Sequence, residues 1–108
     1  TYGNYDDVSG AGVLRGRVSA TYNDGYGVTC PVEQSGKNDW GLYGVGGNVS
    51  EWTDESVCDM WILRGGSWAC SDVGPLMCTT REYGGRFSGL SACARGFRVV
   101  VMPSTSPR

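Results

Sequence analysis

Cysteines are the residues with the most reactive side chains in this sequence, and Cys70 is the one in the most distinctive setting. It follows the stretch LRGGSWA, Leu63 to Ala69, in which two glycines allow the backbone to bend sharply directly before a serine and a tryptophan. Such a bend can present a thiol for chemistry, or it can support a surface that binds a partner. The other thiols and the side chains available to assist them bear on this choice.

The thiols do not form a recognisable metal-binding pattern. Five cysteines occur without any Cys-x-x-Cys pair, so a zinc cluster is not expected. The sequence contains no histidine, which excludes Ser-His-Asp and Cys-His catalytic arrangements and histidine-ligated zinc. Two disulfides with one free thiol, or five reduced thiols, both remain open from the spacing. The five positions are Cys30, Cys58, Cys70, Cys78 and Cys93.

Charge and composition exclude several classes of partner. The 108 residues carry a formal net charge of -2 without a run of like charge, so nucleic acid is not an expected partner. The longest aliphatic run, Val99 to Val101, is far shorter than the ~20 apolar residues of a membrane-spanning helix. The length and the 18 glycines indicate a single domain, residues 1–108, in which irregular loops outweigh regular structure.

Short runs of β-branched and aromatic residues indicate the elements that must position these side chains. Trp61 to Arg64 and Phe97 to Met102 predict strands, and Phe97 to Met102 is expected to be the last strand of the core. Gly12 to Ala20 alternates loosely between apolar and polar residues, which favours an extended segment. Asn23 to Gly27 predicts a loop, because Asn, Asp and Gly accept left-handed backbone. Pro103 to Arg108 predicts a frayed tail.

The types of several glycine, arginine and tryptophan residues predict their backbone conformation, their ion pairs or their burial. Gly65 and Gly66 are expected to adopt positive φ or to pass close to neighbouring backbone. Arg64 and Arg98 lie in or beside apolar strands, where a guanidinium needs an acidic partner such as Glu51. Large rings supply burial that short strands cannot, so four tryptophans are expected in the core, namely Trp40, Trp52, Trp61 and Trp68.

Three clusters in a fixed order resemble a known family. They are NDWGLYGVGGNVSEWTDE from Asn38 to Glu55, LRGGSW from Leu63 to Trp68 and RGFRVV from Arg95 to Val100. Together they resemble the formylglycine-generating enzymes, or sulfatase-modifying factors, over Asn23 to Val101. The resemblance implies an α+β chain with the C-type lectin-like fold, a small twisted antiparallel sheet with abundant irregular loops. It also implies that this chain corresponds to the C-terminal part of the family fold.

The resemblance also implies a possible calcium site. In the family, the glutamate that corresponds to Glu51 joins nearby carbonyl oxygens in holding the ion, which carries over to the carbonyls of Gly47 and Val49. A further oxygen ligand of the family falls on Gly44 here, which has no side chain. We therefore expect no cofactor, with calcium as the open alternative.

Catalytic members of the family resemble one another in two thiols five residues apart, which bind copper and oxidise a substrate thiol. Cys70 matches the first thiol, but Pro75 stands five residues further on, and Cys78 better matches a structural position of the family. We therefore expect that the protein is not an enzyme. The alternative is a copper-dependent formylglycine-generating oxidase that acts on a cysteine of a sulfatase-like substrate, with Cys70 as its catalytic residue.

The variable proteins of diversity-generating retroelements resemble this sequence better. They keep GGSW and GFR as scaffold and vary the loop residues between these motifs through randomised AAC codons, which cannot become codons for Met, Trp, Lys, Gln or Glu. From Ala69 to Ala94 only Met77 and Glu82 belong to that excluded set. The resemblance implies a non-catalytic domain whose hypervariable loop face binds a protein or surface-receptor ligand.

The residues expected to contact this ligand lie in the loops between the two motifs. Tyr83 and Phe87 are expected to be the anchors, because exposed aromatic residues dominate the energetics of interfaces. A fixed structural domain of a phage or bacterial surface protein, whose loops do not vary, is a second alternative. The complete set of candidate contact residues is Ala69, Ser71, Asp72, Val73, Tyr83, Phe87, Leu90 and Ser91.

Overall fold

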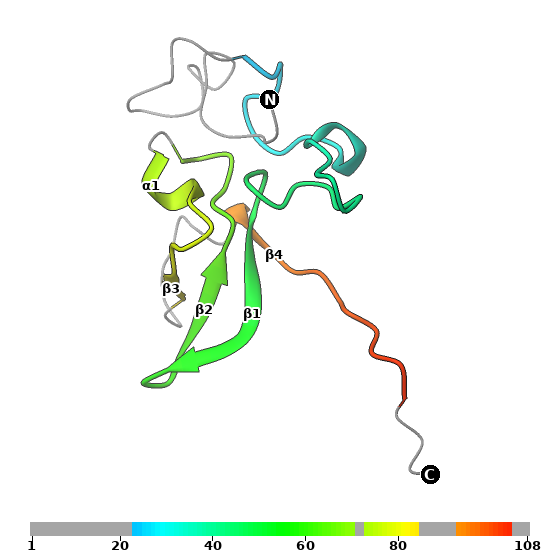
Figure 1. The fold of residues 1–108 in the computed structure, drawn as a ribbon. Coiled ribbons are helices and arrows are strands. Elements are labelled where there is room, and N and C mark those ends of the chain that lie inside the picture. Colours follow the sequence, from blue (N-terminus) through cyan, green and yellow to red (C-terminus); the bar gives the residue numbers. More distant parts are fainter. Residues whose placement is uncertain (1–22, 71–72, 85–92, 105–108) are drawn as a thin grey trace.

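A four-stranded mixed sheet forms the centre of the molecule (Figure 1). The structure is a computed structural model. The strands lie in the order β3-β2-β1-β4, and short helical segments accompany them, which gives an α+β arrangement with little helix in the described part. The structure describes residues 23–70, 73–84 and 93–104.

The two longest strands form an antiparallel hairpin. β1 comprises Ser50–Val57 and β2 comprises Met60–Arg64, which confirms the strand predicted at Trp61 to Arg64. Cys58 and Asp59 connect them with φ values of 49° and 62°, the left-handed backbone that a two-residue hairpin turn requires. A register shift between Trp52 and Ser56 accompanies a visible bend of β1 (Figure 1).

The outer strands are short. β3, Glu82–Gly84, pairs antiparallel with β2, whereas β4, Arg95–Gly96, pairs parallel with Ser50 and Glu51 at the start of β1. The prediction of an antiparallel sheet is therefore wrong for β4. The chain passes from one edge of the sheet to the other between β3 and β4 and runs in the same direction in both, so pairing with β1 must be parallel.

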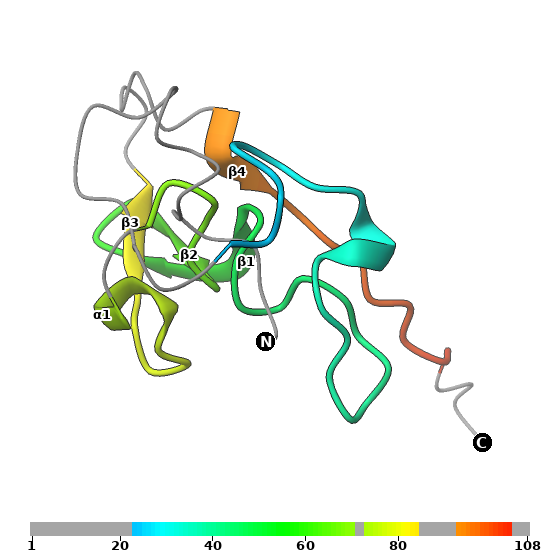
Figure 2. The same ribbon diagram turned by 90° about the horizontal axis from the view of Figure 1, so that it is seen from above.

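The predicted last core strand is also wrong in its position and burial. β4 ends at Gly96, and from Phe97 the chain leaves β1 and runs away from the sheet (Figures 1 and 2). The side chains from Phe97 to Met102 are exposed, with the exposed fraction reaching 88% at Val101. Consecutive β-branched residues favour extended backbone, but a buried strand also needs a partner, and β1 supplies one for two residues only.

Burial in the described residues centres on β2 and the segment that follows it. Ile62 and Leu63 are fully buried in the central strand, and Trp68 is 9% exposed, as predicted. The other three tryptophans do not form a core: Trp40 lies in a turn and is 87% exposed, and Trp61 and Trp52 are 53% and 37% exposed. Trp61 lies close to the hairpin turn, which projects from the rest of the sheet (Figure 1), so its ring has little to pack against.

The remaining elements are short. The 3-10 helix η2 comprises Val32–Gln34, and the helix α1 comprises Val73–Leu76. Asn23 to Gly27 forms the predicted loop, in which the side-chain oxygen of Asn23 accepts a hydrogen bond of 2.8 Å from the backbone N–H of Gly25. The predicted extended segment Gly12 to Ala20 and residues 105–108 of the predicted tail lie outside the described residues. In the described ranges, no helix has the length and hydrophobicity needed to cross a membrane.

Candidate functional site

Two glycines after the end of β2 bend the chain within the core, directly before Ser67 and Trp68. Gly65 and Gly66 have φ values of 98° and 66°, as predicted. A Cβ at Gly65 would lie 2.7 Å from the carbonyl oxygen of Val45, and one at Gly66 would lie 2.6 Å from Leu76 Cδ2, so both positions lack room for a side chain. Ser67 and Trp68 are buried after this bend.

Exposure begins directly after Trp68. The backbone N–H of Trp68 donates to the carbonyl of Asn48 at 2.9 Å, which fixes the last scaffold residue, and Ala69 is exposed. α1 and β3 then lie next to each other on the β3 side of the sheet in both views (Figures 1 and 2). Gly66, Ser67 and Trp68 of the predicted scaffold motif GGSW are thus buried. The predicted binding face begins at Ala69, which lies at the surface.

Arg64 holds the loop between α1 and β3. Its Nη1 donates to the main-chain carbonyls of Cys78 and Thr80, at 3.2 Å each, and its Nη2 lies 3.4 Å from a carboxylate oxygen of Glu55. The other oxygen of Glu55 lies 3.3 Å from Nε of Arg81. The acidic partner of Arg64 is therefore Glu55 rather than Glu51. Since the two hydrogen bonds to the loop end on carbonyl oxygens, they do not depend on the loop side chains.

The predicted contact residues divide into three groups. Ala69 is exposed at the end of the bend, and Tyr83 is 52% exposed on the edge strand β3. Val73 begins α1. The remaining members of the set lie outside the described residues, namely Ser71, Asp72, Phe87, Leu90 and Ser91.

Within the same segment, sequence reasoning missed three residues that belong to the scaffold. Gly84 is buried, and a Cβ there would lie 2.3 Å from Trp52 Cζ3. Ala94, taken as the end of the binding face, is 7% exposed. Glu82 accepts a hydrogen bond of 2.9 Å from Oγ of the buried Ser50. The sequence signal that set Glu82 apart was its place among the residues that randomised AAC codons cannot encode.

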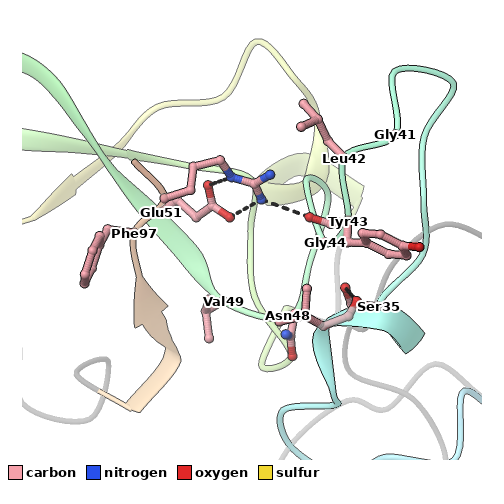
Figure 3. Close-up of a pocket in the computed structure, with 11 residues that line it drawn as sticks. Ser35, Gly41, Leu42, Tyr43, Gly44, Asn48, Val49, Glu51 and Phe97 are labelled. Atoms are coloured by element: carbon pink, nitrogen blue, oxygen red, sulfur yellow. Dashed lines mark hydrogen bonds and ion pairs between the residues drawn. The ribbon is translucent and has the colours of Figure 1, made fainter. Parts of the chain in front are cut away.

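A second cluster lies at the opposite edge of the sheet (Figure 3). Arg98 donates from Nε and Nη2 to the two carboxylate oxygens of Glu51, and Nη2 also donates to the carbonyl of Tyr43 at 3.0 Å. The predicted pairing of Arg98 with Glu51 is confirmed. The hydrogen bond to Glu51 raises the pKa of the Arg98 guanidinium above its ordinary value. The pair borders a cavity of about 350 Å³, which Leu42 and Phe97 also line.

The motifs that build these two clusters match a known family. A family model described as the sulfatase-modifying factor enzyme 1-like domain matches residues 3–103. The chain belongs to this family. Neither the comparison with curated proteins nor the comparison with solved structures gave a significant match.

Cys70 of this sulfatase-modifying factor domain has no cysteine five residues further along the chain. All five cysteines fall within the described ranges, and Cys58, Cys70 and Cys78 are free thiols, which excludes two disulfides in this structure. The Cys70 sulfur accepts a hydrogen bond of 3.3 Å from the backbone N–H of Ser67, inside its own turn. Pro75, at the position of the second catalytic thiol of the family, lies in α1.

The ligands that the family would contribute to a calcium site do not fit the ion as they lie here. Calcium prefers several oxygen ligands at once. Both carboxylate oxygens of Glu51 are already bound by a guanidinium, and the described residues include no group of three or more His, Cys, Asp or Glu that could hold a metal. The carbonyls of Gly47 and Val49 are the remaining members of the set carried over from the family. An ion would therefore have to displace Arg98.

Proposed function

We propose that this domain is a non-catalytic ligand-binding module on a C-type lectin-like scaffold, as in the variable proteins of diversity-generating retroelements. Its binding face is the hypervariable loop segment that begins at Ala69, and its partner is a protein or surface receptor. Membership of the sulfatase-modifying factor family fits this function and the oxidase alternative equally, so the choice between them depends on the loop and on the thiols.

The hydrogen bonds of Arg64 are the observation that carries the proposal. A face whose residues change must keep its backbone in place whichever side chains it carries. Arg64 meets this requirement because its two hydrogen bonds to the loop end on the carbonyls of Cys78 and Thr80. Substitution of exposed side chains that make no such contacts costs little stability.

The oxidase alternative is supported less well by the thiols. Copper chemistry in the family depends on two thiolates that can bind one ion. Cys70 has a proline where the second thiol would stand, and its sulfur accepts a hydrogen bond within its own turn. These observations favour a displayed residue at Cys70 over a catalytic one.

The encoding DNA provides the test. A variable protein of this class requires, close to its gene, a reverse transcriptase and a near-copy of the stretch that encodes Leu63 to Arg98, with differences confined to adenines of the copy. We expect those differences at codons of exposed residues without scaffold hydrogen bonds through their side chains, and none at the codons of Trp68, Glu82, Gly84 or Ala94. Among described residues, the expected positions are Ala69, Cys78, Thr79 and Tyr83.

Two results would contradict the proposal. Differences concentrated at Gly84 and Ala94 would mean that the codons of buried positions vary, which the packing around them does not allow. A complete locus that lacks the near-copy and the reverse transcriptase would favour the fixed structural domain. In that case replacement of Tyr83 by alanine, with the fold intact by circular dichroism, tests whether β3 still contributes to binding.

A further inference from the structure

A cavity lies where the loop before β1, the end of β2 and the segment from α1 to β3 meet. It is called the loop cavity below and has a volume of about 310 Å³. The residues that line it are Val45, Gly46, Arg64, Gly65, Leu76 and Cys78. The loop cavity therefore lies between the scaffold and the loop that Arg64 holds.

Cys78 connects the loop cavity with the proposed binding face. It borders the cavity and is exposed. Its backbone carbonyl accepts one of the two hydrogen bonds by which Arg64 holds the loop, so this wall of the cavity stays in place when the side chain changes. The cavity is thus continuous with the segment whose residues are expected to vary.

The lining favours an apolar occupant. Val45 and Leu76 contribute aliphatic side chains, and Val45 is 44% exposed. Among the residues that line the cavity, Arg64 is the only charged one, and its guanidinium is already paired with Glu55. An apolar group that enters removes aliphatic surface from water, and it strips no unpaired charge of its hydration.

The size of the loop cavity suits a single side chain. Pockets for whole small molecules have volumes of ~300–1,000 Å³, so this cavity is at the lower end of the range. Gly65 keeps part of the wall in place, because its φ is 98° and a Cβ there would lie 2.7 Å from the carbonyl oxygen of Val45. A Cβ at Gly46 would meet nothing within 4 Å, so the space beside Gly46 is open.

We propose that the loop cavity takes one aliphatic side chain of the protein partner, such as that of a leucine. This inference rests on the proposed function, because it assigns the chemistry of the partner at the same binding face. Side chains that fill well-packed pockets carry much of the binding energy of an interface. The exposed residues around the cavity then discriminate between partners that share this anchor.

Thiol–disulfide exchange at Cys78, in the whole chain, tests the chemistry of the loop cavity. The Cys78 thiolate attacks a probe disulfide, one half of the probe stays on Cys78 as a mixed disulfide, and the other half leaves as a thiol. The probes are the symmetrical disulfides of N-isovaleryl-, N-acetyl- and N-succinyl-cysteamine. They carry an aliphatic branch, no branch and a carboxylate. Peptide mass spectrometry measures equilibrium capture at each cysteine at a fixed concentration of 2-mercaptoethanol.

We expect Cys78 to capture the isovaleryl probe at least ~10-fold more strongly than the acetyl or succinyl probe. Each buried methylene favours transfer from water by roughly fourfold, and the branch adds three carbon atoms to the acetyl probe. Cys58 is the matched control, because it is exposed in the hairpin turn and lies outside the cavity lining. It is expected to capture the isovaleryl and acetyl probes equally.

Two variants place the preference in the cavity. Val45→Asp puts a carboxylate in the lining and is expected to abolish the preference of Cys78 for the isovaleryl probe. Val32→Asp is expected to keep it, because Val32 is 59% exposed and does not line the loop cavity. Circular dichroism confirms that both variants are folded.

Three results overturn the inference. Equal capture of the isovaleryl and acetyl probes at Cys78 removes the apolar site, and stronger capture of the succinyl probe replaces it with a carboxylate contact. An equal preference at Cys58 shows that the probe, and not the cavity, causes the effect. The proposed function fails separately: a locus without the near-copy contradicts it while the preference at Cys78 stands, and equal capture beside a locus with the near-copy overturns this inference alone.

Discussion

Replacing Arg64 with alanine is expected to loosen the loop that forms the candidate binding face. The guanidinium makes two hydrogen bonds of 3.2 Å to loop carbonyls and an ion pair of 3.4 Å with Glu55, and 29% of the side chain is exposed. A hydrogen bond from a charged donor contributes about 1.5–3 kcal/mol when well formed. These distances are at the long end of the range, and solvent screens the ion pair, so we expect a total loss of ~2 kcal/mol.

Urea unfolding followed by circular dichroism measures this loss as a lower midpoint at an unchanged m-value. Cys78→Ser and Thr79→Ala are matched controls in the same loop, since they keep the backbone carbonyls, and each is expected to change stability by less than ~0.5 kcal/mol. Arg64→Lys should recover only part of the loss, because an ammonium lacks the planar fork of donors. If the two loop variants lost as much stability as Arg64→Ala, the loop would be held by its side chains and could not be a changeable face.

Four further predictions concern the scaffold and the chemistry of the domain. Trp68→Ala should lower the free energy of unfolding by ~3–5 kcal/mol, whereas Trp40→Ala should change it by less than ~0.5 kcal/mol; similar losses would contradict the described burial. Gly84→Ala should lower the free energy of unfolding by ~1–3 kcal/mol, because the added Cβ overpacks the site. Gly74→Ala should not lower it, because a Cβ there would meet nothing within 4 Å. Added calcium should leave the melting temperature unchanged, because a guanidinium occupies the expected carboxylate ligand; a clear rise would restore the metal site. With copper supplied, mass spectrometry should find no formylglycine in a cysteine-containing sulfatase peptide, and product that disappears in Cys70→Ser would overturn the binding function.

Local signals in the sequence were sufficient for several features of the structure. The strand at Trp61 to Arg64 follows from its composition, and the positive φ of Gly65 and Gly66 follows from a backbone conformation that side chains disfavour. The pairing of Arg98 with Glu51 follows from the cost of placing a guanidinium beside apolar residues without a carboxylate. In each case, the physical cause involves neighbouring residues or one strong charge requirement.

Features that depend on three-dimensional packing were not predictable in the same way. Trp40 was expected in the core from its size, but burial depends on what surrounds a ring, and a turn supplies little. The hydrogen bonds of Arg64 to the loop end on main-chain oxygens. Every residue type has such an oxygen, so the sequence does not indicate which one is the acceptor. The structure has no strand at Phe97 to Met102, and the side chains there are exposed, because a strand needs a partner as well as β-branched residues and the described residues supply none beyond Gly96.

If the proposed function holds, the alternation along β3 has a consequence for how new specificities arise. Glu82 and Gly84 are tied to β1 through a hydrogen bond and close packing, while Tyr83 between them points away from these constraints and is half exposed. A mutational process that reached all three codons would yield many unfolded products, whereas one that spares the flanking codons yields folded proteins in nearly every generation. In such a process, Glu82 and Gly84 maintain the fold while Tyr83 alone changes the contacts with a partner.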